Sequence, residues 1–233
     1  MKNILITTLL IFSIIEVKAQ DFSVQINTGL SHFTGDATSS STFLNAYTDN
    51  HSGYPNAIGN RYVPTYGIDL QLQKVFNGGF IFGTRFGFES INSRVDITSV
   101  KSGGNEIAAS GHADSHLYYF NFNPYIGVRA NLNKINLDVT SGIEIAPGLA
   151  TRKYVDVKTI DGDYFNKPYN FSNFSPREDF RFRLGAEAVY DKFGVTVSYS
   201  RGIKNFNSET FPNSKLLPFY SELFRLGISY RIK

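Results

Sequence analysis

The chain has only four histidines in 233 residues, and two of them are spaced so that they could bind a metal. His112 and His116 flank Asp114, each at a distance of two residues. On an extended strand such residues share a face, so two imidazoles and one carboxylate could converge on a cation. A polar loop end explains the same pattern, so the three remain candidates only. We predict no metal and no cofactor.

Two further patterns suggest a metal-binding loop and a hydrolase site, but each lacks residues that such a site requires. Asp161 and Asp163 offer hard oxygen ligands around a glycine, but the remaining ligands of an EF-hand loop are missing. His32, with Ser31 and Asp36 nearby, has the residue types of a hydrolase, but no nucleophile motif such as G-x-S-x-G surrounds them. We therefore predict no catalytic residue and no enzyme, and keep a lipid- or peptide-modifying enzyme as a third alternative.

The composition excludes several other classes of protein. The chain has no cysteine, so it forms no disulfide framework and no thiolate metal site. Its net charge is +3 and it has no basic tract, which argues against nucleic acid as a partner. Lys2, the apolar stretch 4–15 and Val17-Lys18-Ala19 are typical of a cleaved signal peptide over residues 1–19. Residues 20–233 then form one domain.

Alternation of apolar and polar residues dominates the rest of the chain and predicts strands. We expect strands at 22–33, 62–76, 80–97, 116–132, 135–151, 180–190 and 194–206 and at the C-terminus. Strands of ten or more residues are long for a soluble protein but fit a tilted membrane crossing.

The predicted connections alternate between long and short. Short turns follow 76, 131 and 190, whereas polar stretches at 34–61, 100–115, 152–178 and 207–218 read as long loops. This alternation is typical of an eight-stranded antiparallel up-and-down transmembrane β-barrel with short periplasmic turns and long extracellular loops. Both termini would then be periplasmic, in a Gram-negative outer membrane.

The two faces of these strands differ in a way that suggests an inverted barrel. One face carries Phe, Tyr, Leu, Ile and Val and would meet lipid, while glycines and charges share the other face. Buried charges must pair, and acids equal arginines on this face, so we predict a lumen charge network. Its members are Asp69, Arg85, Glu89, Arg129, Asp138, Glu144, Arg181, Arg183, Glu187 and Arg225.

The arrangement resembles the small outer-membrane β-barrel proteins of the Bacteroidota, a broad group that includes PorT-like and OmpX- or OmpW-like barrels. The resemblance rests on Lys18-Ala19-Gln20, on Phe22-Ser23-Val24 with Gly29, on Asn123-Pro124-Tyr125-Ile126-Gly127 and on Leu226-Gly227-Ile228-Ser229-Tyr230-Arg231-Ile232. It covers residues 20–233 and implies the architecture. Some members of the group resemble accessory components of secretion machinery, so the resemblance also implies an envelope complex as a setting.

We therefore expect a non-enzymatic, integral outer-membrane protein with a structural or interaction role. Its partners would be outer-membrane lipid and other envelope proteins, which it would contact through the four loops at 34–61, 100–115, 152–178 and 207–218. A porin-like narrow pore for a small solute or ion is the alternative. A soluble exported barrel, such as a lipocalin-like binder, would need the Phe-rich face inside and the charges outside.

Overall fold

The computed structural model describes residues 21–46, 53–168, 178–206 and 217–232. The described residues form strands, turns and bends without a helix, which confirms the all-β prediction. Within these ranges no helix is long and apolar enough to cross a membrane. The predicted signal peptide at 1–19 lies outside the described residues.

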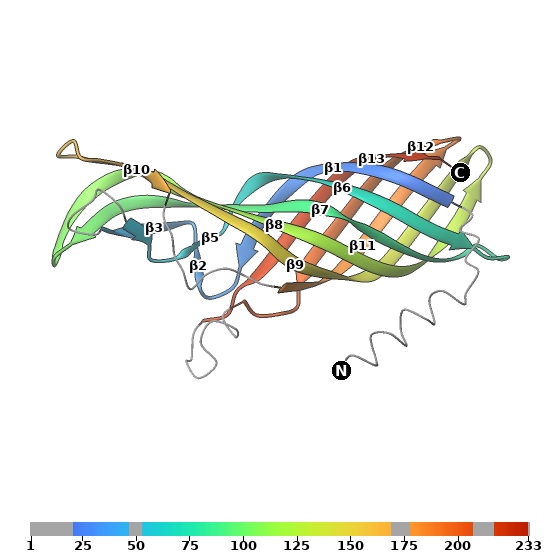
Figure 1. The fold of residues 1–233 in the computed structure, drawn as a ribbon, viewed down its shortest axis with the longest axis horizontal. Helices are drawn as coiled ribbons and strands as arrows, with labels where there is room; N and C mark the ends of the chain where they lie inside the picture. The colour runs from blue at the N-terminus through green and yellow to red at the C-terminus, as the bar shows by residue number, and fades with distance from the viewer. Residues whose placement is uncertain (1–20, 47–52, 169–177, 207–216, 233) are drawn as a thin grey trace.

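Eight long strands make up most of the fold (Figure 1). They are β1 (Asp21–Thr34), β6 (Arg61–Val75), β7 (Phe80–Ser102), β8 (Asn105–Leu132), β9 (Ile135–Thr159), β11 (Glu178–Tyr190), β12 (Phe193–Gly202) and β13 (Tyr220–Arg231). Each pairs antiparallel with the next in this order, and β13 pairs back onto β1 from Ser23↔Arg231 to Thr34↔Tyr220. The ring of pairings is uneven, because its strands range from 10 to 28 residues.

Three tight turns join neighbouring strands at one end of this ring. They follow β6, β8 and β11, and the ends of β1 and β13 lie beside them (Figure 1). Asn133 and Asp191 adopt the left-handed conformation there, with φ of 60° and 52°. Asn and Asp tolerate that region best among residues with a side chain, so they favour the turns after β8 and β11.

At the opposite end β7, β8 and β9 continue well beyond the other strands (Figure 1). The sheet is widened there by β3 (Ser41–Ala46), parallel to β7, by β4 (Gly53–Pro55) on β3 and by β10 (Tyr164–Pro168) on β9. We call this part the extension. β2 (Thr38–Ser39) and β5 (Ile58–Gly59) pair separately.

The extension corrects two predicted loops. Residues 100–115 form the β7–β8 hairpin, which turns at Gly103 and Gly104, and most of 152–178 that is described belongs to β9 and β10. The predicted long connection between β7 and β8 is therefore wrong. These segments pair as strands because their inward side chains are apolar and cluster around Leu44, Val95 and Val157.

A reversal of polarity along β7 explains how one strand serves both parts. Its outward residues run Phe80, Phe82, Phe86 and Phe88, and then Asn92, Arg94, Asp96 and Thr98. Its inward residues run Gly83, Arg85, Gly87 and Glu89, and then Ile91, Val95 and Ile97. The alternation keeps its phase while the apolar side changes from outward to inward. The same strand is thus patterned for an apolar surrounding below residue 89 and for water above it.

Candidate functional site

The interior between the eight long strands holds the charged side chains that the alternation placed on one face. At its centre Glu89 accepts hydrogen bonds from Arg181 Nη1 at 3.0 Å and from Arg225 Nη2 at 2.8 Å. Glu144 accepts from Arg183 Nη1 at 2.9 Å and from Arg225 Nη2 at 3.2 Å. All five side chains are at most 6% exposed. Each arginine therefore faces at least one carboxylate, as buried charges require.

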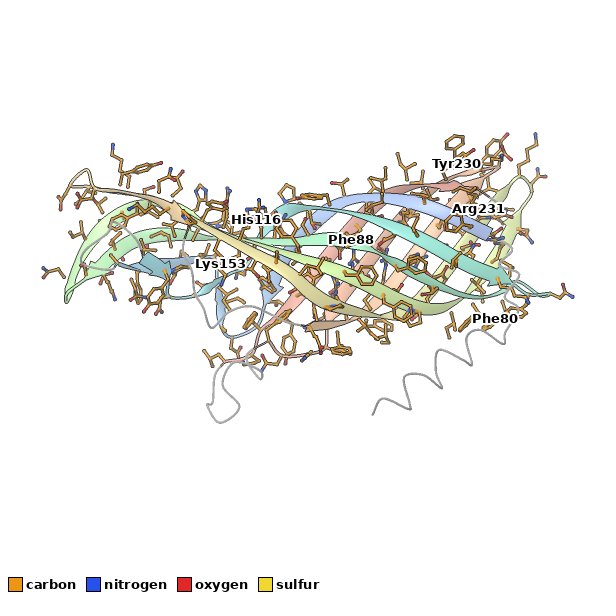
Figure 2. The ribbon with its side chains drawn as sticks, in the orientation of Figure 1. Phe80, Phe88, His116, Lys153, Tyr230 and Arg231 are labelled. Atoms are coloured by element: carbon orange, nitrogen blue, oxygen red, sulfur yellow. The ribbon has the colours of Figure 1, made fainter. Side chains whose placement is uncertain are left out.

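A second cluster lies toward the tight turns. Asp138 binds Arg129 through both carboxylate oxygens, at 2.6 and 2.7 Å. Arg129 also donates to Asp21 at 3.0 Å, and Arg231 donates to Asp138 at 3.2 Å. Figure 2 shows Arg231 at this end of the molecule, beside Tyr230. Four strands, β1, β8, β9 and β13, are thereby linked through their inward side chains.

Three predicted members of the network bind amides and hydroxyls between the two clusters. Arg85 donates to Gln71 at 3.0 Å and lies 4.2 Å over the Tyr125 ring. Glu187 accepts from Ser229 at 2.5 Å, and Asp69 accepts from Asn27 at 2.8 Å. Asp69 also lies 4.0 Å from Arg183 Nη1, at the limit of an ion pair. The ten predicted residues thus all point into the same interior.

Sequence reasoning left out three charges that belong to the same interior. Asp21 and Arg231 sit in the cluster near the turns, and Asp179 lies 3.4 Å from Arg181 and accepts a bond from Ser221. All three share the inward phase of their strands but stand at or next to strand ends. The alternation that identifies the ten network residues extends to these three positions as well.

An aromatic layer covers the central cluster on the side of the extension. Phe33, Phe206 and Phe219 lie with ring centroids 5.2–5.6 Å apart and are at most 4% exposed. Tyr119 joins this apolar cluster, and the Arg181 guanidinium lies 5.8 Å from its ring. The interior is thus filled first by ion pairs and then by packed rings.

The metal candidates lie on the outer face of the extension. His112, Asp114 and His116 share that face, but both Asp114 oxygens accept bonds from Arg94 at 2.7 Å. His116 Nδ1 lies 3.0 Å from the Asn92 side-chain oxygen, and His112 lies 3.7 Å from Asp114. No group of three metal-binding side chains occurs within the described part of the chain. The structure does not bring these residues together as a cation site.

Lys153 is a buried cation that sequence reasoning missed. It points inward from β9 between the two apolar clusters and is 6% exposed (Figure 2). Burial lowers the pKa of its ammonium group to about 8, because a charge loses hydration in an apolar surrounding. The inward phase of β9 would not have identified it, because a bulge at Leu149 shifts that phase.

Comparisons with known proteins give similarity only at the level of solved structures. No protein-family model and no curated protein sequence matches this chain. Ail, the attachment invasion locus protein of Yersinia pestis, is 15% identical with a TM-score of 0.37, over 91% of this chain and 98% of that chain. Neisserial surface protein A is 9% identical with a TM-score of 0.37, over 90% of this chain and 96% of that chain.

The translocator domain of the autotransporter NalP from Neisseria meningitidis is similar over 98% of this chain and 95% of that chain, with 10% identity and a TM-score of 0.30. All three TM-scores are below 0.5. The Bacteroidota PorT-like grouping is not confirmed by these similarities and stays a prediction.

Proposed function

We propose that this chain is an integral outer-membrane β-barrel protein with a non-enzymatic structural or interaction role. The polarity reversal along β7, β8 and β9 carries the proposal. On β8 the outward residues from Tyr118 to Val128 are aromatic, aliphatic or proline. From His116 back to Glu106 they are polar, apart from Ala108. Ten residues of strand are roughly 33 Å long. At a tilt of ~40° they rise about 25 Å, the usual height of the apolar band on such barrels.

The outer surface of the other strands continues the same band. Its apolar side chains are exposed and large, which is costly in water and favourable in hydrocarbon. The clearest are Ile26 at 65%, Tyr66 at 61%, Phe88 at 56%, Val195 at 58% and Ile228 at 66%. A soluble binder would require the opposite arrangement, with these side chains inside and the ion pairs outside. The exposed band therefore favours the membrane.

The filled interior favours a structural role over that of a pore. Its charged side chains pair with one another across the ring, and the aromatic layer of Phe33, Phe206 and Phe219 closes it toward the extension. An eight-stranded ring is about wide enough for its side chains to fill. No specific observation favours conduction.

The extension is the part that we propose contacts partners. It rises from the apolar band as paired strands with an apolar interior, so it presents a fixed surface. From Tyr118 to Asn105, β8 alone covers roughly 43 Å of strand. Envelope proteins in the same or a facing membrane are its expected partners. The described parts of 34–61, 100–115 and 152–178 belong to it or adjoin it, and only Leu217 and Pro218 of the fourth segment are described.

Cysteine labelling tests both location and orientation, because the chain has no cysteine of its own. Thr98 is exposed on the extension and Lys192 is exposed in a tight turn at the opposite end. A membrane-impermeant maleimide should label Thr98→Cys on intact cells and Lys192→Cys only after the outer membrane is permeabilised. The reverse pattern would overturn the orientation. Recovery of the folded chain in the soluble fraction would overturn the membrane location.

A further inference from the structure

A hollow of about 420 Å³ opens on the outer face of the ring, just below the polarity reversal. Its exposed wall is almost entirely apolar and is formed by Ile26, Tyr66, Ile68, Phe88, Tyr118 and Leu149. The lining also includes the residues that alternate with them or lie beside them, namely Asn27, Gly67, Glu89, Ser90 and Tyr119. These residues come from β1, β6, β7, β8 and β9, so the hollow spans five neighbouring strands. Its volume falls within the range of small-molecule sites.

Two irregularities of the sheet produce the hollow. Between Tyr62↔Ser93 and Gly67↔Glu89, β6 has one residue more than β7, and Pro64, which has no amide hydrogen, lies in this bulge. On the far side, Leu149 is an extra residue between the pairs Tyr118↔Ala150 and Tyr119↔Gly148. The outward side chains around both bulges depart from the regular spacing of the sheet, and a recess remains between them.

Polar side chains complete the hydrogen bonds that the β6 bulge interrupts. Asn92 Nδ2 donates to Pro64 O at 2.5 Å, and Thr65 Oγ1 donates to Ser90 O. Ser31 Oγ donates to Asn92 O at 2.9 Å and accepts from Asn92 N at 2.7 Å. Backbone groups in hydrocarbon must be satisfied within the protein. The bulge is therefore stable in an apolar surrounding, and the hollow is a lasting feature of the wall.

A cation stands at the upper rim of the hollow. The Arg152 guanidinium lies 5.9 Å from the centre of the Tyr118 ring, which is itself part of the wall. Arg152 is exposed and forms no ion pair with another residue of the described segments. His116 is its register partner on β8. An apolar recess below a free guanidinium matches a molecule with a hydrocarbon chain and an anionic head.

We propose that this hollow binds one acyl chain of a phosphate-bearing lipid, with the phosphate at Arg152. The inference rests on the proposed membrane location, since only there does the recess open onto hydrocarbon chains. A phospholipid and a lipid A both supply an acyl chain and a phosphate. The recess holds part of one acyl chain and so keeps one lipid molecule in a fixed position on the outside of the ring.

Native mass spectrometry of the purified full chain, released from detergent, tests the proposal. The probes are phosphatidylglycerol, lipid A and a diacylglycerol, which has the acyl chains but no phosphate, each added in steps. We expect one tightly retained lipid on the unaltered protein. Leu149→Trp should fill the recess and weaken binding at least about tenfold, because the chain loses its buried apolar contact. Val195→Trp, at a position 58% exposed on β12, which β13 separates from β1, is the matched control.

The head-group contact is tested separately. Arg152→Gln should weaken binding of phosphatidylglycerol relative to the phosphate-free diacylglycerol about fivefold, the effect of one basic residue at an anionic surface. Lys158→Gln, on the same face of β9, should leave that ratio unchanged. Retention of lipid A alone or of phosphatidylglycerol alone identifies the source of the chain and supports the site in either case.

Equal lipid retention by Leu149→Trp and Val195→Trp would overturn the proposal. If Leu149→Trp does not fold, Ile26→Trp fills the recess from β1, where the side chain is 65% exposed. Failure of lipid binding in a protein that still gives the expected cysteine labelling refutes this inference alone. Failure of the labelling refutes the membrane location itself.

Discussion

Glu89 connects the two most buried arginines of the interior, so its charge should matter more for stability than any charge on the surface. It accepts hydrogen bonds from Arg181, Arg225 and Asn121 and is 6% exposed. Glu89→Gln keeps the shape and one acceptor oxygen but removes the charge that balances two guanidiniums. Breaking a buried ion pair from one side costs about 3–5 kcal/mol. We expect the free energy of unfolding to fall by that amount.

Urea unfolding in lipid vesicles, followed by far-ultraviolet circular dichroism, measures the change, since the chain has no tryptophan for fluorescence. The surface pair Arg61–Asp96, with side chains 50% and 37% exposed, provides the control. Asp96→Asn should cost about 1 kcal/mol at most. Arg225→Met, added to Glu89→Gln, removes one of the guanidiniums that lost its carboxylate partner. The double variant should therefore regain at least about 1 kcal/mol of the lost free energy of unfolding. A loss under 1 kcal/mol for Glu89→Gln would refute the reasoning.

Three further outcomes follow from the structure. Gly87→Ala would place a Cβ against the backbone oxygen of Ile68 and should lower the free energy of unfolding by about 1–3 kcal/mol. Gly185→Ala, whose added Cβ would have its nearest neighbour 3.3 Å away, should leave the free energy of unfolding close to that of the unaltered protein. Equal losses in the two variants would contradict this account of the packing. Burial lowers the pKa of Lys153 to about 8 from 10.5, so the unfolded chain binds more protons between these values and the free energy of unfolding should rise by up to about 3 kcal/mol as pH rises from 8 to 10.5. Lys153→Met should abolish that rise in a pH series of urea unfolding curves, and a rise that persists would mean that another group causes it. In planar bilayers the purified protein should give no steady single-channel conductance because its interior is filled, and regular current steps would disprove that.

The strands that face one surrounding along their whole length were the easiest to predict. Residues 180–190 and 194–206 were expected as strands, and β11 and β12 occupy Glu178–Tyr190 and Phe193–Gly202. Their alternation keeps one polarity, so periodicity alone is sufficient. The extension was missed for the opposite reason. In the segments 100–115 and 152–159 the inward apolar residues are mostly Ala and Val, and most outward residues are polar or charged, such as Asp114, Asp156 and Lys158, so the composition resembles that of a loop.

The sequence was sufficient to predict which charged side chains point into the interior, but not which of them form ion pairs with one another. The phase of each strand determines which side chains point inward, so all ten network residues could be named. Which carboxylate meets which guanidinium depends on the stagger between strands that are distant in the sequence. Glu89 and Arg225, for example, are separated by 136 residues. The aromatic layer was unpredictable from phase, because Phe206 and Phe219 lie outside the strands that flank them.

The polarity reversal on β7 also limits how the chain can change length. A one-residue insertion near Glu89 would shift the phase of everything on one side of it. Above the insertion, Val95 and Ile97 would turn to water while Arg94 and Asp96 turned into the apolar interior. If the residues below it shifted instead, the phenylalanines would exchange places with Arg85 and the glycines. Insertions are instead absorbed at bulges, and the extra residues near Pro64 and at Leu149 mark two positions where the chain already carries one.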